Sequence, residues 1–279
     1  MSKFFCISTR ASLPSGYKDK LHHLTPRFIP DNLQESKILT RQNDNLLLGI
    51  SNPIDSSVIT DYGVIVGSIF GKSHNWDIPG SQHPDGTFSI IRSDKDVIEA
   101  LSDPSGSRAM WYYHDENSFY VSSSQRAIIH FLGDFQFNKS IVPWILSTGT
   151  LGPLGGWDKR LKRIPPDSIL RLNRHTWTLE LIRKPIVFKE VQKSDKVHVH
   201  ELREVLIDHF QRLSIDFEDW MLPISGGFDS RGILLLIKKV TPDTSGLKSL
   251  TWGLSTALKD RKSDAFIAKE LTKALDISN

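Results

Sequence analysis

The chain has 279 residues, of which 39% are hydrophobic and 24% are charged, a composition typical of a globular protein long enough for two domains. Its 35 basic and 32 acidic residues leave a net charge of +3, which is too even a balance for a nucleic-acid footprint. No run of about 18 uncharged apolar residues predicts a membrane span. The single cysteine, Cys6, excludes an internal disulfide and fits a reducing compartment. We therefore expect a cytoplasmic protein with neither a nucleic-acid nor a membrane partner.

The first part of the chain predicts an antiparallel sheet system, because short apolar or alternating runs recur between turn residues. These runs predict strands over residues 3–7, 45–50, 64–70, 88–91, 110–113 and 119–122. Helices are predicted over 125–132 and 142–147, and two further strands over 169–172 and 177–182. Glycines and Pro153 predict a loop over 149–156. We assign residues 1–184 to one domain of the α+β class.

A polar stretch over residues 184–196 predicts the domain boundary, and the second domain then runs over 197–279. It begins with a predicted helix over 197–217, in which Leu202, Val205 and Phe210 recur at helical spacing. Strand, helix, strand and helix then alternate, which predicts the start of an α/β domain with a parallel sheet and right-handed crossovers. Ligands bind at the carboxyl ends of such strands.

The most informative motif is Ser225-Gly226-Gly227-Phe228-Asp229-Ser230, which follows an apolar run and precedes another. Adjacent glycines let the backbone approach a polyphosphate, and the N-terminus of the next helix presents free N–H groups to it. Ser225 and Ser230 add hydroxyl donors. Asp229 cannot donate to a phosphate, so its natural role is to hold Mg²⁺ against the phosphate oxygens. The motif predicts a nucleotide site.

The alternative is structural: a strand-to-helix turn in which Asp229 or Ser230 merely caps the helix. The motif is not the P-loop, whose Gly-x-x-x-x-Gly-Lys-Ser/Thr spacing is absent.

The motif resembles the pyrophosphate loop of the ATP-pyrophosphatases, most closely that of asparagine synthase and its relatives, which include β-lactam synthetases and lasso-peptide cyclases. The resemblance implies a ligase that uses ATP and Mg²⁺. Such an enzyme adenylates a carboxylate, releases pyrophosphate and lets an amine attack the acyl-adenylate. It also implies that the backbones of Leu222, Trp252 and Gly253 flank adenine. The run that begins with Asp264 and Ala265 resembles the helix that follows in this family.

The N-terminal domain resembles the glutaminase-type (Ntn) domain of the same family, a sandwich of antiparallel sheets. Asp85-Gly-Thr-Phe88 matches its Asp-Gly-x-Phe strand, and the resemblance implies that Asp85 holds the amino group of a substrate glutamine. Residues 102–113 resemble its Arg-Asp-x-x-Gly-x-x-Pro-Leu-Tyr-Tyr strand pair. Residues 121–128 and 164–170 resemble two further segments, so that the likeness covers most of the chain from about residue 60 onward.

Two positions depart from this family. Its glutamine-hydrolysing members carry a cysteine directly after the initiator Met, where this chain has Ser2. Ser2 is the one candidate nucleophile in its place, and the alternative is an ordinary serine next to the initiator. Cys6 lies inside an apolar run and is expected to be a small buried strand residue. The family's Asn-Gly-Glu run corresponds here to Val66-Gly67-Ser68, so we expect that glutamine is not hydrolysed.

The family also continues beyond the second strand of its synthetase part, and we expect this chain to be the front part of a larger enzyme. The leading hypothesis is an asparagine-synthase-type ligase acting on a small-molecule or peptide carboxylate. A homodimer is the candidate oligomeric state. The runner-up is a cyclase of the lasso-peptide or β-lactam type. A third hypothesis is a non-catalytic ATP-binding fragment.

Three further sequence features allow a functional or a structural interpretation. Arg231 follows the loop directly and lies in the first turn of a helix, where a cation opposes the helix dipole unless it has a partner. A phosphate of ATP or an acidic substrate group would be such a partner, so we treat Arg231 as a substrate-binding candidate. His198 and His200 lack a third metal ligand at suitable spacing. The basic run over 159–163 predicts a solvated loop, with an acidic leader peptide or a phosphate as the alternative ligand.

Overall fold

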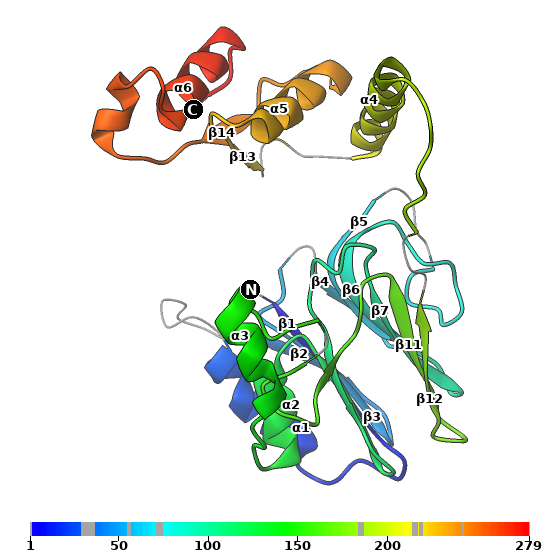
Figure 1. The fold of residues 1–279 in the computed structure, drawn as a ribbon. Helices are drawn as coiled ribbons and strands as arrows, with labels where there is room; N and C mark the ends of the chain where they lie inside the picture. The colour runs from blue at the N-terminus through cyan, green and yellow to red at the C-terminus, as the bar shows by residue number, and fades with distance from the viewer. Residues whose placement is uncertain are drawn as a thin grey trace. The chain divides into compact units, whose positions relative to one another are not determined.

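The computed structural model describes residues 2–28, 37–54, 57–70, 75–153, 155–183, 187–213, 217, 220–241 and 243–278. The chain divides into two compact units, Met1–Val187 and Phe188–Asn279 (Figure 1). Residues 184–186 of the predicted boundary stretch lie outside the described part.

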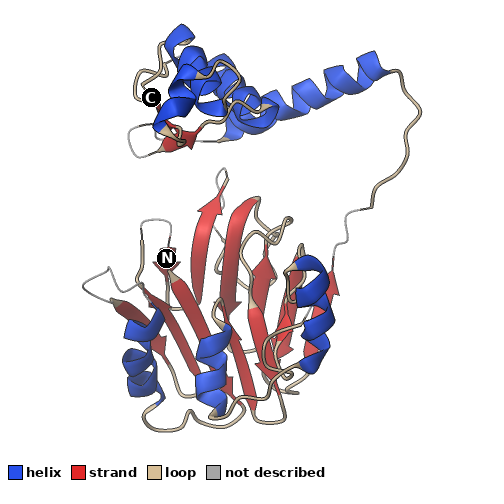
Figure 2. Ribbon diagram, turned by 60° about the vertical axis from the view of Figure 1, so that its left-hand side comes forward, coloured by secondary structure: helices blue, strands red, loops and turns tan. Residues whose placement is uncertain are grey.

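The first unit contains two antiparallel six-stranded sheets (Figure 2). One has the order β10 (Lys162–Arg163), β8 (Trp111–His114), β9 (Ser118–Ser122), β1 (Lys3–Thr9), β3 (Leu46–Ser51) and β2 (Ile38–Gln42). The other has the order β12 (Leu179–Arg183), β11 (Ser168–Asn173), β7 (Val97–Ser102), β6 (Gly86–Ser93), β5 (Gly63–Ile69) and β4 (Ser57–Ile59). The predicted antiparallel sheet system is confirmed.

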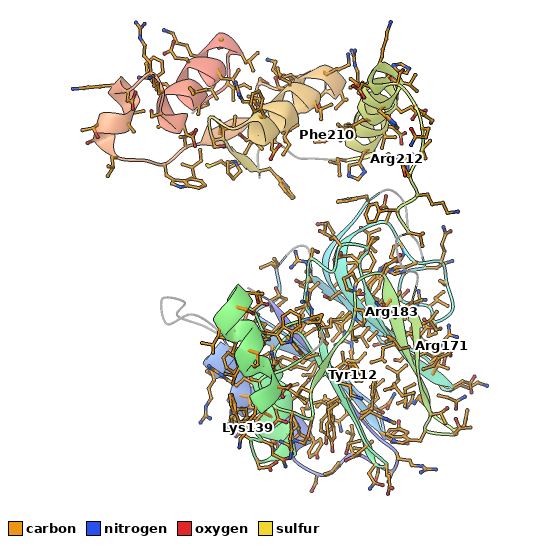
Figure 3. All side chains as sticks on the ribbon, viewed as in Figure 1. Tyr112, Lys139, Arg171, Arg183, Phe210 and Arg212 are labelled. Carbon is orange, nitrogen blue, oxygen red and sulfur yellow. The ribbon has the colours of Figure 1, made fainter. Side chains whose placement is uncertain are left out.

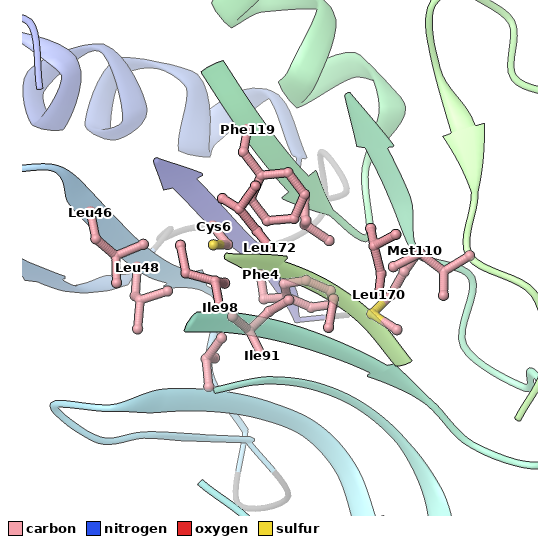
Figure 4. Packing of buried hydrophobic residues seen from close by; sticks show 14 of the residues in the cluster. Phe4, Cys6, Leu46, Leu48, Ile91, Ile98, Met110, Phe119, Leu170 and Leu172 are labelled. Atoms are coloured by element: carbon pink, nitrogen blue, oxygen red, sulfur yellow. The ribbon is translucent and has the colours of Figure 1, made fainter. Parts of the chain in front are cut away.

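The main core lies between the two sheets (Figure 4). Phe4 and Cys6 of β1 meet Ile91, Leu170 and other apolar side chains of the second sheet there. Successive strand residues point to opposite faces, so Phe5 and Ile7 lie on the outer face of the first sheet. All of these β1 residues are buried because both faces of the strand are covered.

Two helices cover the outer face of the first sheet: α1 (Tyr17–Leu24) and α2 (Gln125–Leu132). Leu21 from α1 and Phe131 from α2 pack against Phe5 and Leu47 of the sheet. Figure 1 shows both helices on the same side of this sheet. The remaining helical segments of this unit are η1 (Thr25–Phe28), η2 (Lys139–Ile141) and α3 (Val142–Thr148).

A buried ionic network holds the second sheet together. The Arg92 Nε donates to Glu99 Oε2 at 2.5 Å, and both side chains are fully buried. Arg171, labelled in Figure 3, donates to the other oxygen of Glu99 from the neighbouring strand β11. The Gly80 N–H and the carbonyl of Ser81 complete the network and tie the loop that precedes β6 to the sheet. Strand β7 was not predicted from the sequence because Glu99 interrupts its apolar run. A carboxylate can be buried at this position only because it is paired with arginines.

The second unit contains α4 (Asp195–Arg212), β13 (Met221–Pro223), α5 (Phe228–Val240), β14 (Lys248–Leu250), η3 (Ser255–Lys259) and α6 (Asp264–Ala274). Strands β13 and β14 pair in parallel, with Met221 opposite Lys248. Ser278 forms a further parallel bridge to Lys248. The segment around Ser278 therefore lies beside β14 and adds one bridge to it. A small core that includes Ile224, Leu234 and Ala268 lies between these strands and helices.

The prediction for the first helix of this unit was wrong at its C-terminal end. Helix α4 ends at Arg212 rather than at residue 217, because Leu213 already has extended backbone angles. Leu202 and Val205 are exposed, whereas Phe210, labelled in Figure 3, packs against the small core. Apolar spacing alone therefore identified the helix but not its buried face. No helix in the described part of the chain is long and apolar enough to cross a membrane.

Candidate functional site

The predicted nucleotide loop begins where β13 ends. Ile224 is buried, and its N–H donates to the carbonyl of Leu250 on β14 at 2.9 Å. The Thr251 hydroxyl returns a bond to the carbonyl of Ile224 at 2.8 Å. These two bonds fix the carboxyl ends of the two parallel strands beside each other. The loop therefore leaves from the edge of a parallel sheet at which ligands characteristically bind.

Ser225 and Ser230 close the loop on itself. Their hydroxyl oxygens lie 3.1 Å apart, and the Ser230 hydroxyl also donates to the Ser225 carbonyl at 3.1 Å. The Gly227 N–H donates to the Ser225 hydroxyl oxygen at 3.2 Å. The structure thus brings together the two serines that the motif placed five residues apart.

The N-terminus of α5 follows this loop directly and has no side-chain cap. The residue that caps the helix is Gly227, and no side chain in the described part of the chain accepts a capping bond there. The structural alternative required Asp229 or Ser230 to cap the helix, and neither does so. A helix that begins with exposed, uncapped N–H groups is a ready anion site.

Gly226 lets a second helix reach the loop. A β-carbon placed on Gly226 would stand 2.5 Å from Asp264 Oδ1 and 2.9 Å from Asp264 Cα. Asp264 is the first residue of α6, whose N-cap Ser263 accepts a bond from the Phe266 N–H at 3.1 Å. Glycine is required at position 226 because a side chain would collide with the backbone of α6.

A cavity of about 350 Å³ opens at this point. It is lined by Pro223, Ile224, Ser225, Ser230, Thr251, Trp252 and Asp264. Two serines and one aspartate thus line the same space at the ends of both parallel strands. A second cavity of about 330 Å³ adjoins it, because Thr251 and Trp252 line both.

The remaining predicted residues differ in their relation to these cavities. Leu222 is a half-buried residue of β13 that packs against the small core, and Gly253 lines the second cavity. Asp229 is exposed in the first turn of α5 and does not line either cavity. Asp264, which the sequence identified only as the start of a helix, does line the first one. Its proximity to the loop depends on the chain crossing from β14 to α6, which local sequence patterns do not reveal.

Arg231 folds back onto the loop. Its Nε donates to the Gly227 carbonyl at 3.1 Å, and its guanidinium lies 4.6 Å from the centre of the Phe228 ring. The cation therefore has partners that offset its unfavourable place in the first turn of α5.

The donor set fits Mg²⁺ only as an ion shared with a ligand. No three His, Cys, Asp or Glu side chains in the described ranges converge as a metal site. Mg²⁺ is commonly bound through one or two carboxylates plus substrate phosphates, with waters in the remaining positions. Asp264, which lines the first cavity, and Asp229, exposed in the first turn of α5, are carboxylates of that kind.

The N-terminal serine is hydrogen-bonded at the beginning of β1. The Ser2 hydroxyl donates to the carbonyl of Asn52 at 2.7 Å and accepts from the Ser57 hydroxyl at 3.0 Å. A carbonyl oxygen is no general base, so these contacts do not activate the hydroxyl. Cys6 is fully buried, and burial raises the pKa of its thiol to about 12. The sequence interpretation of Cys6 as a buried strand residue is confirmed.

Asp85 is exposed just before β6, where its backbone carbonyl accepts from the Phe70 N–H at 2.9 Å. The carboxylate that bonds to the backbone of residues 85–88 is instead that of the buried Asp103, which accepts from the Phe88 N–H at 3.1 Å. Burial raises the pKa of Asp103, but hydrogen bonds from Ser107, Ser105 and backbone N–H groups outweigh it and leave the pKa below its usual value. Asp103 thereby organises the turn that follows β7.

Of the further sequence features, the basic run contains a structural ion pair, and the structure assigns no role to the two histidines. In the basic run, Arg160 pairs with Asp134 and with the buried Asp158. His198 and His200 lie on the exposed part of α4.

No family model matches the chain, and no curated protein matches it in sequence. Solved structures do resemble it. Glutamine phosphoribosylpyrophosphate amidotransferase from B. subtilis, complexed with ADP and GMP, aligns with a TM-score of 0.38 and 12% identity over 93% of this chain and 70% of that one. A structure described as the allosteric regulatory enzyme of purine biosynthesis aligns with a TM-score of 0.37 and 13% identity over the same shares of the two chains. These alignments do not assign the chain to a family.

Proposed function

We propose that this chain belongs to an ATP-dependent amide-forming ligase of the asparagine synthase type. Its carboxylate substrate would be adenylated with release of pyrophosphate, and an amine would then displace AMP. The observation that carries the proposal is the serine loop at the ends of β13 and β14, with the uncapped N-terminus of α5 behind it. The further expectations of a PP-loop domain, ATP and Mg²⁺ all depend on this one feature.

Each residue of the loop has a defined task in this proposal. Ser225, Ser230 and the first N–H groups of α5 would bind the phosphates, because all of them can donate and none carries negative charge. Gly226 and Gly227 let the backbone come close. The backbones of Leu222, Trp252 and Gly253 would border adenine.

Mg²⁺ would be held by phosphate oxygens together with Asp229, Asp264 or both. The ion would neutralise the charge that develops on the departing pyrophosphate. Without such an ion, the Asp264 carboxylate would repel a phosphate in the cavity that it lines. This argument from charge makes a divalent cation part of the proposal.

We propose that the amine does not come from glutamine. The Ser2 hydroxyl donates to a backbone carbonyl, no side-chain base in the described part of the chain is recorded as accepting its proton, and Cys6 is buried. Asp85 then has no glutamine to hold. The amine would be ammonia or a group already present on the substrate. The latter case describes a cyclase of the lasso-peptide or β-lactam type, which is the second candidate function.

The first experiment measures nucleotide binding by isothermal titration calorimetry with α,β-methylene-ATP and Mg²⁺. We expect binding by the unaltered chain. Ser225→Ala combined with Ser230→Ala should weaken it at least tenfold, because each serine donor to a charged phosphate contributes about 1.5–3 kcal/mol. Ser147→Ala on the exposed helix α3 is the matched control and should change nothing.

The second experiment follows radiolabelled pyrophosphate released from ATP in the presence of candidate carboxylates and ammonia. Release of pyrophosphate and AMP supports the ligase, whereas formation of ADP and phosphate contradicts it. Binding without any turnover supports the third hypothesis, a non-catalytic ATP-binding fragment. Absence of nucleotide binding overturns the proposal as a whole.

A further inference from the structure

The cavity that adjoins the serine loop has a composition of its own. It measures about 330 Å³ and is lined by Thr251, Trp252, Gly253, Leu254, Ser255, Leu258, Ala265 and Lys269. The indole of Trp252 and the side chains of Leu254 and Leu258 are all substantially exposed. Apolar side chains thus provide most of the side-chain surface of this cavity.

Lys269 is the single charged residue of that lining. It lies four residues after Ala265 on α6, so the two share one face of the helix. No carboxylate in the described part of the chain forms an ion pair with its ammonium group. The cavity therefore combines apolar walls with one cation that is available to a ligand.

The walls of the cavity are held in place. The Ser263 hydroxyl donates to the Ala257 carbonyl at 2.5 Å and so ties η3 to the beginning of α6. At the beginning of η3, the Ala257 N–H donates to the carbonyl of the N-cap residue Leu254 at 2.8 Å. Leu254 and Leu258 are consequently carried by a segment that is anchored to the helix bearing Lys269.

We propose that this cavity binds the carboxylate substrate of the ligase: an apolar carboxylic acid whose chain lies on Trp252 and Leu258 and whose carboxylate pairs with Lys269. This inference rests on the proposed function. Adenine, which the proposed function places against the backbones of Leu222, Trp252 and Gly253, can accept a hydrogen bond from an ammonium group but forms no ion pair with it, whereas a carboxylate gains an ion pair at the edge of apolar walls. With the acid in this cavity, adenine lies on the serine-loop side of Trp252. The charge of Lys269 thus decides between the two occupants.

The position of the cavity suits the reaction. Thr251 and Trp252 line both this cavity and the one that contains the serine loop. A carboxylate held here adjoins the space proposed for the phosphates. In the adenylation step, a carboxylate oxygen bonds to the α-phosphorus as the bond from that phosphorus to the bridging oxygen breaks. Pyrophosphate then leaves with the electron pair.

The experiment titrates the chain with octanoate and phenylacetate and, in parallel, with the uncharged octanamide and phenylacetamide. Calorimetry should show binding of at least one acid at millimolar or lower concentration and weaker binding of its amide. Lys269→Gln should weaken binding of the acid about two- to fivefold, the range for an exposed ion pair, and leave the amide unchanged. Lys269→Arg should bind the acid as tightly as the unaltered chain does.

Two controls make the test specific. Lys273→Gln removes an exposed cation of the same helix that does not line the cavity and should have no effect. Leu258→Glu places a carboxylate in the cavity and should reduce binding of the acid more than that of its amide. Equal binding of acid and amide, no binding of either acid at 10 mM, or no effect of Lys269→Gln overturns the inference.

Binding of α,β-methylene-ATP separates this inference from the function on which it rests. A chain that binds the ATP analogue but no acid leaves the ligase proposal standing and overturns the substrate pocket. A chain that binds the acid through Lys269 but not the analogue supports the pocket and overturns the ligase.

Discussion

Asp264 lies so close to Gly226 that no other residue fits at position 226. Its Oδ1 and its Cα would stand 2.5 and 2.9 Å from a β-carbon there. The carboxylate can rotate away, but the Cα belongs to the first turn of α6 and cannot move alone. Close packing of the serine loop against α6 therefore depends on this glycine.

Gly226→Ala should disturb both the loop and the helix. We expect a loss of about 1–3 kcal/mol in the free energy of unfolding, as for other overpacked sites, and at least tenfold weaker binding of α,β-methylene-ATP. Gly232→Ala is the matched control. Gly232 lies inside α5 with no atom within 4 Å of an added β-carbon, so alanine should stabilise the helix by about 0.5–1 kcal/mol. Urea unfolding and calorimetry measure both effects, and an unaltered affinity of Gly226→Ala would contradict the proposed site.

Sequence reasoning succeeded where one chain segment carries the whole signal. Strand β1 and helix α2 were predicted within two residues because an apolar run or a helical period is local. The serine loop was found for the same reason. Its two glycines, two serines and one acid lie within six residues.

It failed where a partner distant in the sequence determines the environment. Strand β7 is disguised by Glu99, which is buried only because Arg92 and Arg171 approach from both neighbouring strands. Strand β2 (Ile-Leu-Thr-Arg-Gln) has only two half-buried positions and no alternating apolar pattern, and it forms by pairing with β3. Asp264 and Lys269 became candidate site residues only when the structure placed α6 beside the loop and Trp252. Local patterns contain no information on such contacts.

Glu99→Gln should be among the most destabilising single changes in the first unit. It leaves Arg92 and Arg171 with an uncharged partner, and breaking a buried ion pair typically costs about 3–5 kcal/mol. Glu180→Gln is the control. Glu180 is exposed on β12 opposite Arg171, and its change should stay within about 0.5 kcal/mol. Urea unfolding at pH 7 measures both, and equal stability of the two variants would exclude the network as a stabilising element.

The same network predicts a pH dependence. Burial raises the pKa of Glu99, but hydrogen bonds from Gly80, Arg92 and Arg171 and the charge of Arg92 outweigh it and lower the pKa below 4.5. A carboxyl with a lowered pKa in the folded state stabilises the protein fully above its unfolded value and progressively less as the pH falls below that value. Unfolding followed from pH 7 to pH 3 should therefore show a smaller loss of stability for Glu99→Gln than for the unaltered chain. An equal loss of stability in the two proteins between pH 7 and pH 3 would contradict a lowered pKa of Glu99.

Ser2→Ala should affect stability and not chemistry. The change removes the bonds of the hydroxyl to Asn52 and Ser57, which costs about 1 kcal/mol. Ammonia-dependent release of pyrophosphate should be unaltered, and neither protein should release glutamate from glutamine. Ser57→Ala, which breaks one of the same bonds without touching position 2, is the control and should lower stability by a similar or smaller amount. Glutamate release that disappears in Ser2→Ala alone would identify Ser2 as a nucleophile and contradict this interpretation.

The two carboxylates near the serine loop make separable predictions about Mg²⁺. Asp264 lines the phosphate cavity, whereas Asp229 lies in the first turn of α5 outside it. If both hold the ion, Asp229→Asn and Asp264→Asn should each raise the Mg²⁺ concentration needed for half-maximal binding of α,β-methylene-ATP about tenfold. Asp243→Asn, which changes an exposed acid elsewhere in the same unit, should leave this concentration unchanged.

Calorimetry with α,β-methylene-ATP in the absence of Mg²⁺ provides the second readout. Removal of Asp264 should strengthen metal-free binding because a carboxylate no longer opposes the phosphates. Weaker binding with and without Mg²⁺ would show instead that Asp264 acts by packing against Gly226.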